Sequence, residues 1–298
     1  MDTVAMNVMK LTEMFHSDER CRAYLEALRW PDGLACLRCQ STKISRSYKR
    51  HQFVCDSCAY NFSVTAGSIF HDTKLGLPKW FMAVYLMCES KKGMSANQMK
   101  RTLGIKTYKT AWYLCHRIRA AMQDASATML TGIVEVDETY IGGKRRGGAG
   151  KALKNKTMVF GAVQRGGNVR LRVGPNNSRK VLHAYIKQMI HDDAEAIYSD
   201  QHQSYVGLKD YNTRHESVNH AQEEWVRGDV HTNTVENVWS LFKRSIIGSY
   251  HQLSEKHMDA YLDEMAWRFN QRHNPYLFRD TLIRLVNAET LEYKELIG

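Results

Sequence analysis

Four of the seven cysteines of the 298-residue chain lie in two Cys-x-x-Cys pairs, Cys36 with Cys39 and Cys55 with Cys58. Each pair can turn two thiolates toward one ion, and the interval between the pairs is typical of a four-cysteine zinc ribbon. Four thiolates leave no open position for water, so we predict a structural Zn²⁺ that this small module needs in order to fold. A redox function is disfavoured, because no βαβ pattern surrounds either pair.

Two aspartates stand out by their positions in predicted strands. Asp137 lies inside the β-rich run Ile133–Ile141, where an acid is costly unless it is paired or bound to a metal. Asp200 ends the short β-rich run Ala196–Asp200, before a polar segment. Both aspartates are therefore candidates for a functional site.

A third acid lies on a predicted helix. Residues His231–Arg244 carry apolar side chains at helical spacing, which indicates one buried face. Glu236 and Lys243 are seven residues apart, close to two turns, so an acid and a base share one face of this helix. Taken alone, Glu236 is an ordinary surface acid, and its interpretation depends on what the rest of the chain places beside it.

The elements that would position these three acids follow a mixed α/β pattern. Hydrophobic β-rich runs predict strands at residues 133–141, 158–163, 169–173, 196–200 and 214–220. Helical periodicity predicts helices at residues 181–190, 231–244 and 254–272. Antiparallel strands followed by a helix, further strands and more helices make a mixed α/β domain.

The segment before this domain is predicted to be all-helical. A capping box at Ser95–Gln98 opens a short helix, a turn at Gly104 follows, and a longer basic helix comes next. This order is typical of a helix-turn-helix, with the recognition helix expected within Thr107–Arg119. The rival interpretation is a plain three-helix bundle with a solvated basic face. Five basic residues are expected to point largely outward: Lys106, Lys109, His116, Arg117 and Arg119.

The charge of the chain indicates a polyanionic partner. Its net charge is +11 and its pI is about 9.3, which favours nucleic acid as that partner. An acidic membrane surface is disfavoured, because the chain has no long basic amphipathic helix. The basic, glycine-rich stretch Lys144–Lys156 is either a solvated loop or a grip for DNA phosphates, beginning with Lys144, Arg145 and Arg146.

The sequence shows neither a secretory signal nor a membrane-spanning segment. The chain has no run of 18 or more apolar residues, and its N-terminal stretch carries early acids instead of the apolar core of a secretory signal. A hydrophobic content of 43% with only 4 prolines favours a folded globular protein over a disordered one. We therefore expect a cytoplasmic protein with no membrane partner.

These patterns divide the chain into five segments, so we predict a multidomain protein. The expected segments are a helical lead-in at 1–30, a zinc ribbon at 31–70, a helix-turn-helix segment at 71–130, an α/β domain at 131–273 and a helical tail at 274–298.

Several motifs together carry a family resemblance. The segments VDETYIGGK, YSDQHQSY and HTNTVENVWSLFKR resemble the signature segments of DDE transposases with an RNase H-like catalytic core. With the zinc ribbon and the helical segment that begins SANQMKRTLGI, the chain resembles the bacterial insertion-sequence transposases of the ISXO type. The resemblance extends from about Trp30 to Arg272, and its motifs occur in the order of the family.

The resemblance implies that Asp137 and Asp200 ligate two divalent ions, Mg²⁺ or Mn²⁺. Acidic DDE enzymes add a glutamate that a basic residue follows seven positions later, and Glu236 and Lys243 match this arrangement. Some members of the group have asparagine as the third element, which makes Asn233 the alternative ligand. Because Mg²⁺ prefers carboxylate oxygens to amide oxygens, we predict Glu236 as the third ligand.

The leading hypothesis from this resemblance is a transposase that binds the terminal inverted repeats of its element, hydrolyses a phosphodiester and joins the exposed 3′-hydroxyl to target DNA. Lys243 and Arg244 would contact DNA phosphate beside the site. Two alternatives stay open: an RNase H-like nuclease or resolvase without strand transfer, and a domesticated DNA-binding regulator with an inert core. The resemblance also implies a homodimer, because transposition joins two DNA ends, and a bacterial, nucleoid-associated location.

Overall fold

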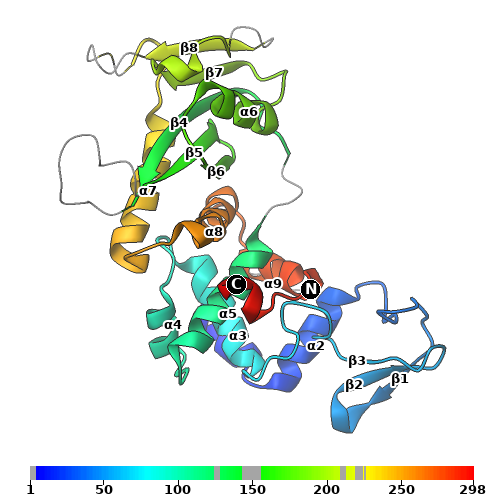
Figure 1. Cartoon of the computed structure of the whole chain (residues 1–298). Helices are drawn as coiled ribbons and strands as arrows, with labels where there is room; N and C mark the ends of the chain where they lie inside the picture. Colours follow the sequence, from blue (N-terminus) through cyan, green and yellow to red (C-terminus); the bar gives the residue numbers. More distant parts are fainter. Residues whose placement is uncertain (1–4, 124–127, 143–155, 209–212, 219–223, 225) are drawn as a thin grey trace. The chain divides into compact units, whose positions relative to one another are not determined.

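The computed structural model describes residues 5–123, 128–142, 156–208, 213–218, 224 and 226–298. The chain forms two compact units, one comprising Met1–Met122 with His273–Gly298 and the other comprising Gln123–Arg272. The chain therefore returns to its first unit after completing the second, and its C-terminal helices belong with the N-terminal ones (Figure 1).

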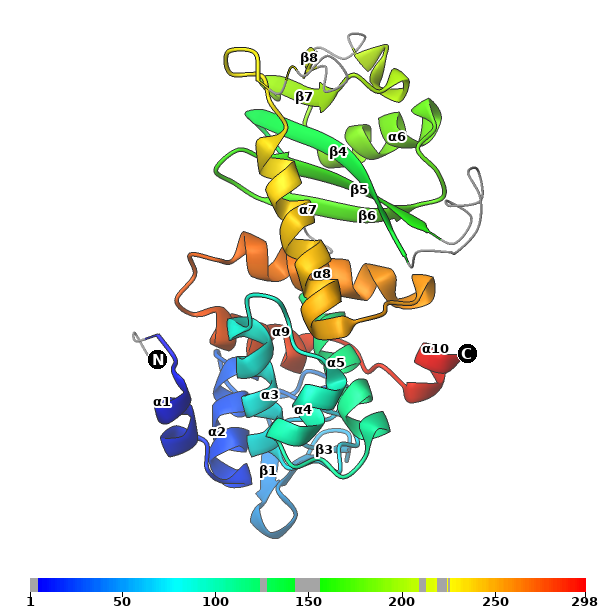
Figure 2. The ribbon, with the colours of Figure 1, turned by 90° about the vertical axis from the view of Figure 1, so that its left-hand side faces the viewer.

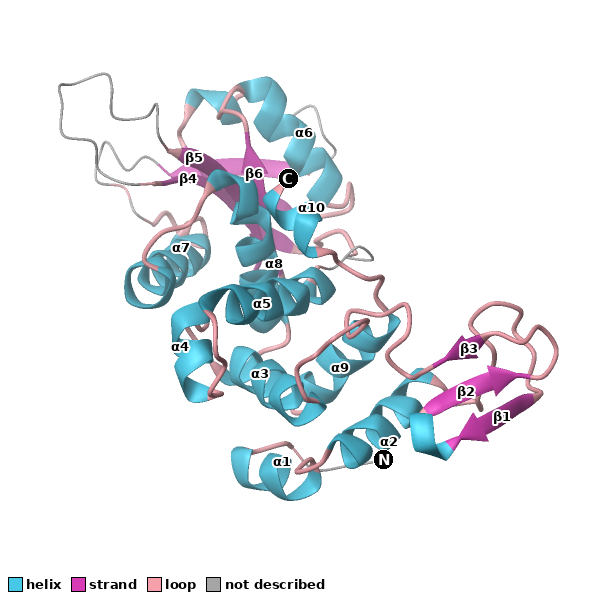
Figure 3. Cartoon of the chain, turned by 60° about the horizontal axis from the view of Figure 1, so that its bottom comes forward, coloured by secondary structure: helices cyan, strands magenta, loops and turns pink. Residues whose placement is uncertain are grey.

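The first unit is mainly helical. Its helices are α1 (Val8–Met14), α2 (Asp18–Arg29), α3 (Leu77–Glu89), α4 (Ala96–Thr102), α5 (Tyr108–Met122), α9 (Leu277–Asn287) and α10 (Tyr293–Ile297). The side chains of Asn7, Ser17 and Ser95 accept hydrogen bonds from first-turn amides and so fix where α1, α2 and α4 begin. Helix α9 packs against α2, α3 and α5, which ties the end of the chain to its beginning (Figure 3).

The cysteine-rich segment of the first unit is a three-stranded antiparallel sheet in the order β1-β2-β3. Strands β1 (Ile44–Ser47) and β2 (Gln52–Cys55) form one hairpin, and β2 forms a second with β3 (Asn61–Phe62). The short helical turn η1 (Tyr48–Arg50) makes the tip of the first hairpin. Both hairpins confirm the ribbon predicted from the cysteine spacing. Their shared core is small, so the sheet needs more than apolar burial to stay folded.

The second unit is built on a five-stranded sheet in the order β6-β5-β4-β7-β8 (Figure 2). Its strands are β4 (Ile133–Ile141), β5 (Thr157–Gln164), β6 (Val169–Gly174), β7 (Ala196–Asp200) and β8 (Arg214–Val218). The first three strands pair antiparallel, whereas β7 joins β4 in parallel and β8 joins β7 in parallel. The mixed sheet predicted from the sequence is thus confirmed.

Helices cover both faces of this sheet. Helix α6 (Arg179–Met189) packs on one face, and α7 (Asn233–Ser245) and α8 (Met258–Asn270) pack on the other (Figure 2). Side chains alternate along β4, so Val134 and Val136 enter the core under α6. The residues between and beyond them, Glu135 and Asp137, point to the face that α7 covers. This alternation decides which acids of the strand can act together.

Short turns complete the second unit. They are η2 (Gln203–Tyr205), the π-helical turn η5 (Ile246–Tyr250) that continues α7, and η6 (Glu255–His257) before α8. Within the described part of the chain, no helix has the length and apolar character that crossing a bilayer requires.

Candidate functional site

Asp137 and Asp200 lie side by side on neighbouring parallel strands. The pairing of β4 with β7 sets Glu135 opposite Tyr198. Asp137 and Asp200 come two residues after this last recorded pair, and the negative charge of Asp200 acts on Asp137. Because side chains two residues apart on a strand share a face, both aspartates point to the α7 side of the sheet. The sheet itself therefore brings together two of the acids predicted from the sequence.

The carboxyl group of Asp137 is held in an environment that disfavours its charge. Burial, followed by the negative charges of Asp200 and Glu138, raises the pKa of Asp137 from 3.8 to about 7. A divalent cation between the two aspartates would offset this repulsion and favour the ionised form. Carboxylate oxygens are also the ligands that Mg²⁺ prefers. The pair therefore suits a divalent cation.

Helix α7 orients Asp137 through Trp239. The indole Nε1–H donates a hydrogen bond to Asp137 Oδ2 at 2.8 Å. The ring lies over Gly161, the residue opposite Asp137 on β5, where an added Cβ would come within 2.5 Å of Trp239 Cζ2. A glycine at this position lets the helix approach the sheet closely. Gly161 and Trp239 therefore act together to fix one predicted ligand.

The remaining predicted residues lie on the exposed edge of α7. Glu236 is exposed and accepts a hydrogen bond from Thr232 Oγ1 at 2.8 Å. Asn233 is the exposed first residue of the helix. Lys243 and Arg244 are exposed in its last turn. The structure thus places the acid and the base of the predicted motif on one helix.

Glu236 does not form a closed cluster with the two aspartates. Among the described residues, the four ribbon cysteines are the one group of three or more potential metal ligands whose atoms lie within 4.8 Å of one another. The structure therefore brings Asp137 and Asp200 together and leaves Glu236 on the helix that contacts Asp137. The choice between Glu236 and Asn233 as third ligand stays a prediction.

Glu138 points to the other face of the sheet, as strand alternation requires. Tyr205 Oη donates a hydrogen bond to Glu138 Oε2 at 2.6 Å, and Asn177 Nδ2 donates to Oε1 at 3.2 Å. These contacts tie β4 to η2, the turn that follows Asp200. Glu138 therefore supports the segment next to the aspartate pair and is directed away from the α7 side.

Sequence reasoning missed Glu135, which is fully buried and contacts the first turn of α7. Two signals could have found it. Glu135 precedes Asp137 by two residues, so both share a face of the strand, and a buried carboxylate always needs partners. The hydrogen bond of Trp239 was also accessible to reasoning, because a buried indole N–H needs an acceptor.

A hollow of about 630 Å³ opens beside Asp200. Side chains from β7, η2, β8 and the segment before α7 line it, among them His202, His215 and Arg227. Its volume falls in the range that small-molecule sites occupy in proteins. Asp200 therefore borders a space that can receive part of a substrate.

The four predicted zinc ligands converge in the first unit. Cys36 Sγ lies 3.7 Å from Cys58 Sγ, and Cys39 Sγ lies 3.5 Å from Cys55 Sγ. Zinc–thiolate bonds of ~2.3 Å place tetrahedral ligands roughly 3.8 Å apart, so the four sulfurs fit one ion. Burial opposes ionisation of Cys36, but backbone hydrogen bonds from Cys39 and Arg38 lower its pKa to about 6. This centre is built for a thiolate-bound metal.

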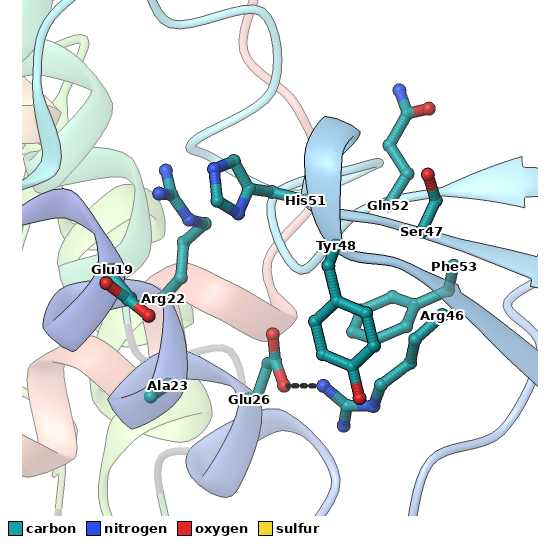
Figure 4. Close-up of a pocket in the computed structure, with 10 residues that line it drawn as sticks. All are labelled: Glu19, Arg22, Ala23, Glu26, Arg46, Ser47, Tyr48, His51, Gln52 and Phe53. Carbon is teal, nitrogen blue, oxygen red and sulfur yellow. Dashed lines mark hydrogen bonds and ion pairs between the residues drawn. The ribbon is translucent and has the colours of Figure 1, made fainter.

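The tip of the ribbon faces helix α2 across a small hollow of about 180 Å³ (Figure 4). Arg46 of the ribbon pairs with Glu26 of α2 at 3.0 Å, and Figure 4 shows Arg22 extending from α2 and His51 extending from the ribbon. Tyr48 at the tip is 80% exposed. An ion pair therefore joins the ribbon to α2 and leaves an aromatic ring among basic side chains at the surface.

The predicted recognition helix presents fewer basic residues than its sequence pattern indicates. Lys106 and Lys109 are exposed. The prediction that His116, Arg117 and Arg119 point outward is wrong, because 5% or less of the surface of each is exposed. Helix α5 packs against α3, α4 and α9, so its buried face is wider than one amphipathic stripe.

Arg117 was predicted to contact DNA, but its guanidinium makes contacts inside the helical unit. Its guanidinium lies 5.1 Å from the ring centres of both Trp80 and Tyr113, and it donates a hydrogen bond to the backbone oxygen of His71 at 2.8 Å. Burial lowers the pKa of Arg117. Arg117 therefore stabilises the packing of the helical unit and does not form part of an exposed basic surface.

The strand order of the second unit, with aligned acids on its two central strands, defines an RNase H-like catalytic domain that follows a zinc ribbon. Family models agree with this class of protein. Residues 129–270 match the ISXO2-like transposase domain, and residues 16–61 match the transposase zinc-ribbon domain. These two matches, in this order along the chain, confirm the resemblance to insertion-sequence transposases that was seen in the sequence.

The chain is also similar to individual proteins and solved structures. An uncharacterized protein in transposable element ISH50 of Halobacterium salinarum is 29% identical over 252 residues, which cover 77% of this chain and 83% of that protein. Among solved structures, the magnesium-bound HTLV-2 integrase catalytic core domain is 14% identical, with a TM-score of 0.31 over 49% of this chain and 88% of that one. A chain of the pre-cleavage Mos1 transpososome is 12% identical, with a TM-score of 0.24 over 68% and 77%.

Proposed function

We propose that this protein binds the terminal inverted repeats of its element, hydrolyses a phosphodiester in an Mg²⁺-dependent reaction and transfers the exposed 3′ end to target DNA. The alignment of Asp137 with Asp200 on the α7 side of the sheet carries this proposal. Two adjacent carboxylates that repel each other favour a divalent cation. The match to a transposase family supports strand transfer as the reaction.

Asp137, Asp200 and Glu236 would hold two divalent ions, with Asn233 as the alternative third ligand. Mg²⁺ or Mn²⁺ bound there would supply Lewis-acid catalysis of phosphoryl transfer. Lys243 lies about two turns from Glu236 on the same helix, so it would contact the DNA phosphate next to the reacting one.

Exposed basic side chains in both units would bind DNA through its phosphates. Lys106 lies just before α5, Lys109 lies in its first turn, and Arg244 lies in the last turn of α7. Arg117 is not among them, because it is buried. Three further basic residues predicted for this role lie outside the described residues: Lys144, Arg145 and Arg146. The salt dependence of binding measures how many phosphates these residues neutralise.

The proposed reaction also implies how many protein chains act together. Because transposition joins two ends of one element, we propose a homodimer that acts on nucleoid DNA in the bacterial cytoplasm. Light scattering of the protein with and without element-end DNA tests the subunit number, and a complex with one protein chain per pair of ends would contradict it.

Cleavage and joining of element-end DNA test the proposed activity. We expect products that require Mg²⁺ or Mn²⁺, and we expect Asp137→Asn and Asp200→Asn each to lower the rate by at least roughly 10³-fold. Asp193→Asn is the matched control, because Asp193 precedes β7 and its side chain is 89% exposed. Parental activity in either of the first two variants would overturn the assignment.

The same assay separates the alternatives. Metal-dependent hydrolysis without joining would replace the transposase with a nuclease or resolvase. Sequence-specific binding without cleavage at any Mg²⁺ or Mn²⁺ concentration would replace it with a DNA-binding regulator.

A further inference from the structure

The buried acid of β4, Glu135, connects the sheet to the start of α7. Its side chain has no exposed surface. Glu135 Oε2 accepts hydrogen bonds from the backbone N–H groups of Thr234 at 2.7 Å and Val235 at 3.1 Å. Glu135 Oε1 accepts a third bond from Thr234 Oγ1 at 2.8 Å. The carboxylate therefore caps a helix that begins about a hundred residues later in the chain.

Helix α7 depends on this cap because the residue at its N-cap position does not supply one. That residue, Thr232, accepts no hydrogen bond from a first-turn amide, and its hydroxyl donates to the side chain of Glu236. His231 Nδ1 accepts a long hydrogen bond of 3.4 Å from the Asn233 N–H, which leaves the amides of Thr234 and Val235 to Glu135. The first amides of a helix have no intrahelical acceptor, and the helix dipole is positive at this end. A carboxylate placed there satisfies both the amides and the dipole.

An arginine compensates the buried charge and fixes the segment before the helix. Arg165 Nε donates to Glu135 Oε1 at 2.7 Å, and other guanidinium nitrogens donate to the backbone oxygens of Asp229 at 2.8 Å and His231 at 3.1 Å. The guanidinium carbon lies 4.8 Å from the centre of the Tyr198 ring on β7. Glu135 and Arg165 together hold β4, β7 and the approach to α7 in one arrangement.

The same strand anchors α7 at a second point, through the bond from Trp239 to Asp137. Two residues along a strand advance about 6.6–6.8 Å. The four or five residues from Thr234 or Val235 to Trp239 advance about 6–7.5 Å along a helix. These lengths agree, so the two anchors hold α7 along β4 without strain and fix its position along its axis.

We propose that Glu135 is a positioning residue for the metal site: it sets the axial position and rotation of α7, so that Glu236, between the two anchors, is presented beside Asp137. This inference rests on the proposed function. Glu135 itself is not a ligand of that site, because both of its oxygens are occupied by donors and a guanidinium lies against it. A cation there would be repelled by Arg165.

Glu135→Gln tests the inference, and Glu264→Gln is its matched control. Glu264 is also fully buried and paired with an arginine, Arg268, in the same unit, but it lies in α8. We expect Glu135→Gln to speed hydrogen exchange of the Thr234 and Val235 amides at least roughly tenfold, because they lose a charged acceptor. We also expect the Mg²⁺ concentration for half-maximal cleavage to rise at least fivefold, whereas Glu264→Gln changes neither quantity.

Parental exchange at these amides, or an unchanged half-maximal Mg²⁺ concentration in Glu135→Gln, would overturn the inference. So would an equal rise in Glu264→Gln, because that effect would belong to general destabilisation. If the parent itself shows no metal-dependent cleavage, the proposed function fails, and the exchange rates still decide whether Glu135 caps α7. Thr234→Val removes one donor and keeps the side-chain shape, so a smaller change in the same direction is expected even if Glu135→Gln does not fold.

Discussion

The cysteine centre and the aspartate pair both gather like charges for a cation, but they do so by opposite means. The four cysteines come from one short stretch, and their sulfurs already lie at the spacing of a single tetrahedral ion. Asp137, Asp200 and Glu236 come from two strands and a helix, and only the two aspartates are aligned. We therefore expect the ribbon to need its metal in order to fold, and we expect the catalytic domain to fold before it holds a metal.

Loss of one thiolate should unfold the ribbon without changing metal binding at the aspartate pair. We expect Cys55→Ser to lose zinc and to unfold the ribbon, because structural zinc binding supplies on the order of 10–16 kcal/mol in small zinc modules. Mn²⁺ binding by the catalytic domain should persist. Zinc content and limited proteolysis of residues 36–58 measure the first effect, with Cys88→Ala, a buried cysteine outside the centre, as control. A protease-resistant ribbon without zinc would contradict the comparison.

The charge of Asp137 should cost stability when no divalent ion is present. Its folded pKa of about 7 lies above the ordinary value of 3.8, so the folded state holds the proton more tightly and loses stability as pH rises from about 4 to about 7. Each pKa unit corresponds to about 1.4 kcal/mol, so Asp137→Asn should gain a few kcal/mol on the parent over this range.

The gain of Asp137→Asn is measured by urea unfolding of the catalytic domain in metal-free buffer at several pH values. Added Mg²⁺ should stabilise the parent and reduce the difference. A difference that does not change with pH would show that Asp137 is not disfavoured as a charge.

Close approach of α7 to the sheet should be sensitive to one methyl group. In Gly161→Ala the new Cβ would overlap the Trp239 ring, so we expect a loss of about 1–3 kcal/mol and an activity at least tenfold lower. Gly248→Ala is the control, because a Cβ at Gly248 meets no atom within 4 Å. Thermal unfolding and cleavage assays compare the two variants. Equal behaviour would mean that Trp239 does not orient Asp137.

The smallest effect should come from the indole N–H alone. Trp239→Phe keeps an aromatic ring over Gly161 and removes one hydrogen bond, which contributes about 1 kcal/mol. Because that bond favours the ionised carboxylate, its loss should raise the pKa of Asp137 further and weaken Mn²⁺ binding several-fold. Trp267→Phe, at a buried tryptophan in α8, is the control for ring size. Unchanged Mn²⁺ affinity in Trp239→Phe would show that the indole N–H does not help Asp137 to bind the metal.

The parts of this molecule that the sequence predicts are those that local patterns specify. The Cys-x-x-Cys spacing and the β-rich runs around Asp137 and Asp200 are short-range signals, and the ribbon and the five-stranded sheet follow from them. The sequence indicates that the carboxylate of Glu135 and the indole N–H of Trp239 need partners, but it does not identify those partners, because they depend on how far α7 lies along β4. No local pattern encodes that distance. Burial of Arg117 was missed for a similar reason, since helices distant in sequence cover a face that its own helix leaves polar.

Direct titration with Mn²⁺ tests the central claim that the aligned aspartates form a divalent-metal site. Electron paramagnetic resonance of the zinc-loaded protein should show Mn²⁺ bound to the parent and to Asp193→Asn. Asp137→Asn and Asp200→Asn should each weaken this binding at least tenfold, because each removes one of two adjacent anionic ligands. Mn²⁺ binding as tight in Asp137→Asn and Asp200→Asn as in the parent would contradict the account.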